Sequence, residues 1–199
     1  MNRLLVGILV SATLTVPAFA ALKLNDKAPD FSAKASLAGK EFDFSLRNAL
    51  KKGPVVVYFY PSAFTGGCNI QAHTFAENKE KFDAAGASII GVSRDSIVRL
   101  NAFSADPEYC AGKLAVASDP DGVIATSYGL AKMSLKAGMK DTRGIEIDHE
   151  FTERTTFIVT PDGKVAATFS TTDDKISPAA HVEKALAAVQ QLASRKSSK

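Results

Sequence analysis

Val55-Val-Val-Tyr-Phe-Tyr-Pro61, followed by Ser62-Ala-Phe-Thr-Gly-Gly-Cys68, is the stretch that decides the fold. β-Branched and aromatic residues fill its first half, which predicts a strand that is apolar on both faces, as in a sheet covered by helices. Pro61 ends this strand, a turn rich in Ser, Thr and Gly follows, and helical spacing begins at Cys68. A thiol in that position lies at the positive end of a helix, where the thiolate is favoured. Cys68 is therefore the first candidate for a functional residue.

The segments that follow continue a strand–helix alternation. Residues 68–85 carry Phe75 and Phe82 on one side and charged residues on the other, which predicts a long helix that ends at Gly86. Residues 87–92 predict a second buried strand. Asp95 or Ser96 can cap the next helix, whose apolar stripe is Ile97, Leu100 and Phe103.

The two ends of the chain supply further strands and a last helix. Residues 31–35 and 41–46 predict an N-terminal β-hairpin with Phe42 and Phe44 on one buried face. Residues 155–159 and 165–169 predict two strands around a Pro-Asp-Gly turn, and Ser177-Pro178 starts a final helix. Residues 131–148 predict an irregular surface excursion. The expected architecture is one α/β domain with a central mixed sheet flanked by helices.

The first 20 residues have a different character from the rest. One Arg, an apolar run from Leu4 to Val16 and the small-residue ending Ala18-Phe-Ala20 follow the order of a secretory signal peptide. The apolar run is short for a membrane span, so an uncleaved anchor is the less favoured alternative. We expect residues 1–20 to be a cleavable signal peptide, residues 21–199 to be the mature domain, and the protein to be exported, most simply to the periplasm, with no membrane association after cleavage.

Composition narrows the classes of partner. The net charge is +3, with 24 Lys and Arg against 21 Asp and Glu, so no nucleic-acid surface is expected. The three histidines, His73, His149 and His181, have no ligand spacing, so no metal and no other cofactor are expected.

The two cysteines, Cys68 and Cys110, leave two interpretations open at this point. In an oxidising compartment they could form a structural disulfide, and Cys68 could be a small buried residue at a helix start. A cysteine nucleophile instead needs a stabilised thiolate and a polar pocket. The residues before Cys68 provide for this: Thr65 can place a hydroxyl beside the sulfur, Pro61 shields one side, and Gly66 and Gly67 let the backbone approach a small ligand.

Pro61-Ser-Ala-Phe-Thr65-Gly-Gly-Cys68 resembles the Pro-x-x-x-Thr-x-x-Cys signature of the peroxiredoxins, which are thiol peroxidases with a thioredoxin-like fold. The resemblance covers most of the mature chain. Ala28-Pro-Asp-Phe31, Gly91-Val-Ser-Arg-Asp-Ser96 and Ser118-Asp-Pro-Asp-Gly122 resemble other family segments in the right order, and Arg154-Thr-Thr-Phe-Ile-Val-Thr160 resembles the segment with the active-site arginine. The most similar subgroup is the peroxiredoxin Q or bacterioferritin-comigratory type.

The resemblance implies a role for each site residue. Cys68 is the peroxidatic cysteine, which reduces hydrogen peroxide or an organic hydroperoxide and becomes a sulfenic acid. Thr65 hydrogen-bonds the peroxide and the sulfur, Pro61 keeps water out of the pocket, and Arg154 stabilises the thiolate and the leaving oxygen. The alternative for Arg154 is a charge at a surface strand edge.

Further implied residues bind substrate or resolve the sulfenic acid. Gly67 and Gln71 are the expected substrate-binding residues, and Gln71 supplies a pocket hydrogen bond. Many relatives carry a second cysteine five residues after the first, where this chain has His73, which we expect to be a helix-surface or packing residue. Cys110 is then the expected resolving cysteine, forming an intramolecular disulfide with Cys68. A mechanism with Cys68 alone is the alternative.

The resemblance also implies the partners, which are peroxides and a thioredoxin-like or other dithiol reductant. A monomer or weak dimer is expected. A disulfide needs Cα atoms within roughly 7 Å, and a cysteine in a helical turn rarely lies that close to one that follows a distant helix. The first turn of the helix after Gly67 is therefore expected to unwind in each cycle. Two other functions compete: an exported thiol–disulfide oxidoreductase, disfavoured because no Cys-x-x-Cys is present, and a non-catalytic protein with a structural Cys68–Cys110 bridge.

Overall fold

The structure is a computed structural model that describes residues 20–197 of the chain. The expected signal peptide, residues 1–20, lies outside the described residues except for Ala20. In the described part, no helix combines the length and apolar character needed to cross a bilayer.

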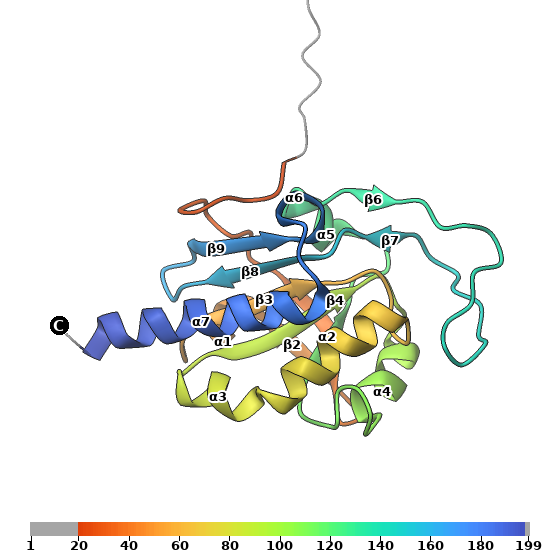
Figure 1. Ribbon diagram of the computed structural model, residues 1–199, viewed down its shortest axis with the longest axis horizontal. Coiled ribbons are helices and arrows are strands. Elements are labelled where there is room, and N and C mark those ends of the chain that lie inside the picture. Colours follow the sequence, from red (N-terminus) through yellow and green to blue (C-terminus); the bar gives the residue numbers. More distant parts are fainter. Residues whose placement is uncertain (1–19, 198–199) are drawn as a thin grey trace, which may run out of the picture.

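A seven-stranded mixed sheet forms the centre of the molecule, with the strand order β2-β1-β5-β4-β3-β8-β9 (Figure 1). In chain order, its strands are β1 (Ser32–Leu37), β2 (Lys40–Ser45), β3 (Val55–Phe59), β4 (Ser88–Ser93), β5 (Ala115–Ser118), β8 (Thr155–Val159) and β9 (Val165–Ser170). β3 pairs in parallel with β4 and antiparallel with β8, so the strand before Cys68 lies inside the sheet. The expected α/β architecture is confirmed.

Successive side chains of β3 point into two different apolar cores, one on each face of the sheet. Every residue of β3 is buried. Val56 and Tyr58 point into one apolar cluster, and Val55, Val57 and Phe59 point into the other, because successive strand residues face opposite sides of a sheet. A continuous apolar run is therefore what this position requires.

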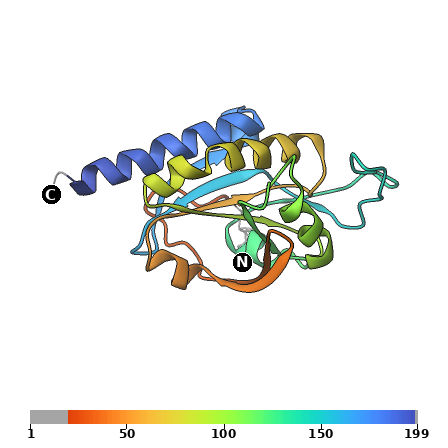
Figure 2. The same cartoon turned by 90° about the horizontal axis from the view of Figure 1, so that it is seen from below.

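The helices cover both faces of the sheet (Figure 2). They are α1 (Leu46–Leu50), α2 (Gly66–Glu77), α3 (Lys79–Ala84), α4 (Ile97–Ala105), α5 (Val123–Ser127), α6 (Thr171–Asp174) and α7 (Pro178–Ser197). Side chains of α2, α3, α4 and α7 belong to the same core as Tyr58, and those of α1 and α5 belong to the opposite core. Both cysteines lie in the first of these cores.

Two local expectations were wrong, and one short helix was not expected. Residues 68–85 form two helices, because Asn78 leaves helical geometry (φ −96°, ψ 5°) and its side-chain amide donates to the Thr74 carbonyl oxygen at 2.9 Å. The N-terminal hairpin forms, but β2 is an edge strand and the Phe42 side chain is exposed. The short helix α6 was not indicated by any apolar periodicity.

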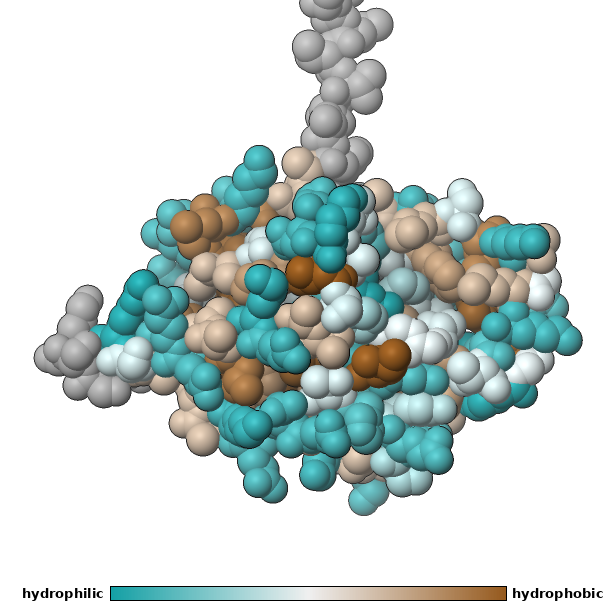
Figure 3. Space-filling model, viewed as in Figure 1, coloured by the Kyte–Doolittle hydropathy of each residue, from teal (hydrophilic) through white to brown (hydrophobic). Residues whose placement is uncertain are grey.

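The excursion is more ordered than its sequence indicated. β6 (Lys132–Met133) pairs with β7 (Phe151–Thr152), and the segment between them extends beyond the body of the protein (Figure 1). Its return limb contains the buried residues Asp141 and Ile147, so this part is not a plain surface loop. On the face seen in Figure 3, hydrophilic side chains predominate and apolar ones lie in small groups.

Candidate active site

The turn between β3 and α2 holds Cys68 at the start of a helix. Thr65 is the N-cap in extended geometry, and the helix begins at Gly66, two residues earlier than expected. Cys68 is the third helical residue, and its side chain is almost fully buried. The first backbone N–H groups of a helix have no partner within the helix and favour negative charge nearby. The structure thus places a free thiol at the N-terminus of α2.

Arg154 reaches Cys68 from the start of β8, the strand that pairs with β3 in the sheet. It lies directly before β8, is buried, and donates from Nη2 to Cys68 Sγ at 3.3 Å. Its Nη1 donates a short hydrogen bond to Gln71 Oε1. The interpretation of Arg154 as a surface charge is therefore wrong. One guanidinium links the thiol to the expected pocket residue of the same helix, as only a planar fork of donors can.

Gly67 makes room for this guanidinium. A Cβ atom on Gly67 would lie 3.2 Å from Arg154 Nη2 and 3.3 Å from Pro178 Cγ. Both distances are tighter than ordinary carbon contacts, so a side chain here would push against the arginine or against the start of α7. The backbone freedom expected of Gly67 thus has a second, packing reason.

Thr65 and Pro61 lie at the mouth of the turn, both half-buried. The Thr65 hydroxyl donates to the Ser62 carbonyl oxygen at 2.8 Å. Because this hydrogen bond uses the hydroxyl proton, the Thr65 oxygen can act only as an acceptor toward a ligand. Among the described residues, no hydrogen bond joins Thr65 to Cys68, so the expected contact with the sulfur is not made in this state.

Cys110 is buried and free in the turn after α4. Burial, and then the nearby Asp106 carboxylate, raise the pKa of the Cys110 thiol far above its ordinary value. A protonated buried thiol is a poor nucleophile, so Cys110 has to leave this environment before it can react. The neighbouring segment is tied to α2 by His73, whose Nδ1 lies 2.9 Å from the Glu108 carbonyl oxygen. His73 is half-exposed, in keeping with the expected surface role.

Tyr58 is a site residue that the sequence pattern did not indicate. Its hydroxyl is buried without a hydrogen-bond partner, and a Cβ atom on Gly91 would lie 2.6 Å from it. Burial is the main cause that raises the pKa of Tyr58 well above its ordinary value. Tyr58 and both cysteines belong to the same apolar core. A Tyr in an apolar strand gives no sign of such a position, because its ring alone accounts for the pattern.

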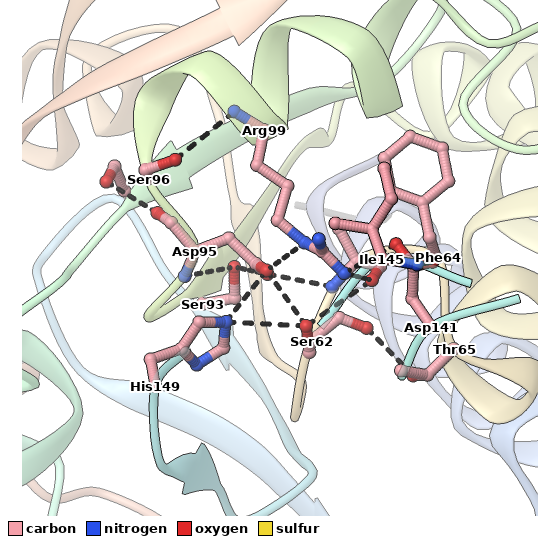
Figure 4. Close-up of polar contacts among 12 residues, drawn as sticks. Ser62, Phe64, Thr65, Ser93, Asp95, Ser96, Arg99, Asp141, Ile145 and His149 are labelled. Carbon is pink, nitrogen blue, oxygen red and sulfur yellow. Dashed lines mark hydrogen bonds and ion pairs between the residues drawn. The ribbon is translucent and has the colours of Figure 1, made fainter. Parts of the chain in front are cut away.

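A buried polar cluster behind the turn was missed as well (Figure 4). Asp95 accepts hydrogen bonds from the Ala63 backbone N–H at 2.7 Å and from the Ser62 hydroxyl at 2.9 Å. The expected capping role belongs to Ser96, whose hydroxyl accepts from Arg99 N at 3.3 Å. His149 Nε2, in the segment between β6 and β7, contacts the same carboxylate at 2.9 Å.

Ser62, His149 and Asp95 do not form a hydrolytic triad. In such a triad one ring nitrogen faces the serine and the other faces the carboxylate. Here Nε2 faces both Asp95 and, at 3.4 Å, Ser62, and Nδ1 lies 2.9 Å from the Glu150 carbonyl oxygen. Ser62 is also fully buried. Elsewhere in the described chain, no three His, Cys, Asp or Glu side chains group as metal ligands.

Comparison with known proteins agrees with this geometry. The model of the AhpC/TSA family matches residues 24–168. Peroxiredoxin Bcp of Xanthomonas campestris is 32% identical over 136 residues, 68% of this chain and 76% of that protein. Peroxiredoxin Bcp of Escherichia coli is 29% identical over 143 residues, 72% and 85% of the two chains.

Solved structures show the same relationship. The crystal structure of peroxidoxin BcpB from Mycobacterium tuberculosis superposes with a TM-score of 0.70 at 29% identity, covering 85% of this chain and 97% of the other. Xanthomonas campestris peroxiredoxin Q gives a TM-score of 0.62 at 29% identity, with 80% and 90% covered. The chain belongs to the AhpC/TSA family and is a thiol-dependent peroxidase of the peroxiredoxin Q/Bcp-like kind.

Proposed function

We propose that this protein reduces hydrogen peroxide and organic hydroperoxides by a two-cysteine cycle in which Cys68 is the peroxidatic and Cys110 the resolving cysteine. The observation that carries the proposal is the 3.3 Å contact between Arg154 Nη2 and Cys68 Sγ at a helix N-terminus. A buried thiol with a guanidinium donor and free backbone N–H groups is an activated nucleophile, not a packing residue.

In the first step, the Cys68 thiolate attacks one peroxide oxygen and the O–O bond breaks. The proton of the attacked oxygen passes to the departing oxygen, which leaves as water or alcohol, and Cys68 becomes a sulfenate that takes a proton from solvent to give the sulfenic acid. Arg154 stabilises the negative charge that moves from the sulfur to the leaving oxygen, as preorganised donors do. The Thr65 oxygen accepts a hydrogen bond from the peroxide O–H, because its own proton is donated to the Ser62 carbonyl oxygen. Gln71 holds the guanidinium, Gly67 gives it space, and Pro61 limits water at the mouth.

In the second step, the Cys110 thiolate attacks the sulfenic sulfur, a disulfide forms, and the oxygen leaves as water. A thioredoxin-like dithiol then reduces the disulfide and is itself oxidised. Because both thiols are buried and Cys110 is held protonated, the cycle requires the first turn of α2 and the Cys110 segment to open. The Gly66–Gly67 pair lowers the cost of that opening.

Non-reducing peptide mapping before and after one equivalent of hydrogen peroxide tests both thiol roles. Wild type should convert from two free thiols to one Cys68–Cys110 disulfide, and dithiothreitol should reverse this. Cys68→Ser should leave Cys110 free, whereas Cys110→Ser should stop at a Cys68 sulfenic acid. A disulfide already present before peroxide would indicate a structural bridge. Multiple turnovers of Cys110→Ser at the wild-type rate would indicate a mechanism with Cys68 alone.

The opening has its own test. Amide-exchange protection through residues 66–72 should fall on oxidation, and equal protection in the two redox forms would contradict the unwinding step.

We also propose export, from the order of residues 1–20. The native protein should begin at Ala21 in the periplasmic fraction, and an intact N-terminal mass would argue against cleavage.

A further inference from the structure

His149 is bonded in a way that requires two ring protons. Its Nδ1 lies 2.9 Å from the Glu150 carbonyl oxygen, and its Nε2 lies 2.9 Å from Asp95 Oδ1. Both oxygens can only accept, so a neutral imidazole would point a lone pair at one of them. The imidazolium form alone satisfies both contacts.

Asp95 connects this ring to the peroxide-binding turn. Its Oδ2 accepts from Ala63 N and from the Ser93 hydroxyl, both at 2.7 Å. Its Oδ1 accepts from the Ser62 hydroxyl at 2.9 Å and lies 2.8 Å from Arg99 Nε. The carboxylate is fully buried, so each donor matters to the cost of keeping it charged.

The turn needs such support because its conformation is strained. Phe64, directly before Thr65, has φ +61°, a left-handed conformation that a bulky residue rarely adopts. The excursion also holds this residue: Thr142 donates both its N–H and its hydroxyl to the Phe64 carbonyl oxygen at 2.9 Å, and the Arg143 guanidinium lies 3.3 Å from the ring centroid. Arg99 Nη2 donates to the Ala63 carbonyl oxygen at 3.0 Å.

The charged groups around His149 all favour its protonated form or are paired elsewhere. Asp95 faces it from the end of β4, Asp148 precedes it, and Glu150, which follows it, is near Lys132 and Arg94. Arg99 of α4 faces Asp95 and is shared with Asp141. Burial lowers the pKa of His149, but the hydrogen bond and charge of Asp95 outweigh this and raise it above the ordinary value. Burial raises the pKa of Asp95, and the bond and charge of His149 bring it below the ordinary value.

We propose that His149, held as an imidazolium, is a positioning residue for the peroxide-binding turn and acts on it through Asp95. The proposal rests on the proposed function of Cys68 as the residue that reacts with peroxide. His149 touches neither the thiol nor the substrate; it fixes the charge and orientation of the carboxylate that holds Ser62 and Ala63.

The proposal has a direct consequence for pH dependence. The rate of Cys68 oxidation should fall with rising pH as His149 loses its proton, because Asp95 loses a charged donor and the turn loosens. Since the pKa of His149 is raised, this fall lies above the ordinary histidine value of about 6.5.

The test compares His149→Gln with wild type in single-turnover oxidation by hydrogen peroxide at a series of pH values. Gln keeps an N–H donor for Asp95 that does not titrate. We expect the wild-type rate to show a falling limb at high pH, and His149→Gln to lack this falling limb and to react about tenfold more slowly near neutral pH. His73→Gln is the matched control, since His73 also lies between two oxygen acceptors but is half-exposed on α2. A falling limb that persists in His149→Gln would overturn the proposal.

A second measurement does not depend on peroxide chemistry. The exchange protection of the Ala63 amide, corrected for the intrinsic pH dependence, should fall across the same pH range in wild type and stay constant in His149→Gln. Nitrogen NMR of the His149 ring in the wild-type protein should show the imidazolium at neutral pH, whether or not the variant folds. A neutral ring would overturn the proposal. If peroxide does not oxidise Cys68 at all, the proposed function fails, and the exchange and ring measurements still decide the role of His149.

Discussion

Replacing Arg154 by methionine is the sharpest test of how the site activates Cys68. Methionine keeps most of the buried stem of the side chain but removes both donors, the one on Cys68 Sγ and the one on Gln71 Oε1. The thiol and the helix start remain. The substitution therefore isolates the guanidinium.

The expected magnitude follows from the geometry. A single hydrogen bond to a charged group contributes about 1.5–3 kcal/mol, and loss of one preorganised donor to developing charge slows an enzyme about 10²–10³-fold. Arg154 Nη2 is buried and 3.3 Å from the sulfur, so little solvent screens it. We expect the rate constant for Cys68 oxidation to fall about 100-fold, or about 2.7 kcal/mol in activation free energy.

Arg154→Lys gives an intermediate expectation. The charge is kept, but a single ammonium cannot bond Cys68 and Gln71 as a planar fork does. We expect a loss of about tenfold.

The assay uses Cys110→Ser as the background, so that only Cys68 reacts. The chain has no Trp to report on the reaction, so samples mixed with hydrogen peroxide are acid-quenched at intervals and the remaining thiol is counted by alkylation and mass. Iodoacetamide alkylation of the same variants measures the thiolate alone. If the Arg154 substitutions lower the rate constant more with peroxide than with iodoacetamide, the difference measures how much Arg154 stabilises the leaving oxygen.

Arg47→Met is the control, because Arg47 is an exposed arginine paired with Asp30 far from the turn. It should react as wild type does. If folded Arg154→Met reacts within threefold of wild type, the guanidinium does not activate Cys68 through the 3.3 Å contact.

Two further predictions concern the surroundings of Arg154. Gly67→Ala should remain folded, but its Cys68 should be oxidised about tenfold more slowly in the same assay, because the new Cβ would lie 3.2 Å from Arg154 Nη2. An unchanged rate would mean that the arginine moves aside without cost. His181 is buried between the Thr156 and Thr171 hydroxyls, and burial, then the charge of Arg154, lower its pKa to about 4. Below about pH 6.5 the unfolded chain therefore binds a proton at this histidine that the folded protein does not bind. In urea unfolding, the free energy of unfolding should fall by about 3 kcal/mol between pH 6.5 and 4, and this group should cause no further loss below pH 4. An equal pH dependence in His181→Gln would refute the assignment.

Much of the fold was predictable because its signals are local. The apolar run of β3 predicts a strand buried on both faces, and the turn to α2 follows from Pro61, Gly66 and Gly67 within a few residues. The break at Asn78 was not predictable from apolar spacing, because Phe75 and Phe82 keep the same period across it. The competing hydrogen bond from the Asn78 side chain decides that break.

In the candidate site, too, the sequence indicated some residues and missed others. The motif around Cys68 and the segment of Arg154 identified the thiol and its cationic partner, and the structure brings Gln71 to the same guanidinium. The excursion was misjudged because its composition of Gly and charged residues is that of a surface loop. A buried charge shows no periodicity, and its partner lies elsewhere in the chain.

The sequence by itself determined the strand, the turn and a following helix with Cys68 near its start, since each depends on neighbours a few residues away. Only the tertiary structure decided which distant groups satisfy the buried polar atoms: Arg154 at the sulfur, and His149, 54 positions from Asp95, at the carboxylate behind the turn. The reason is physical. A buried charge needs a partner in space: the pairing of β8 with β3 brings Arg154 to Cys68, and the segment between β6 and β7 brings His149 to Asp95.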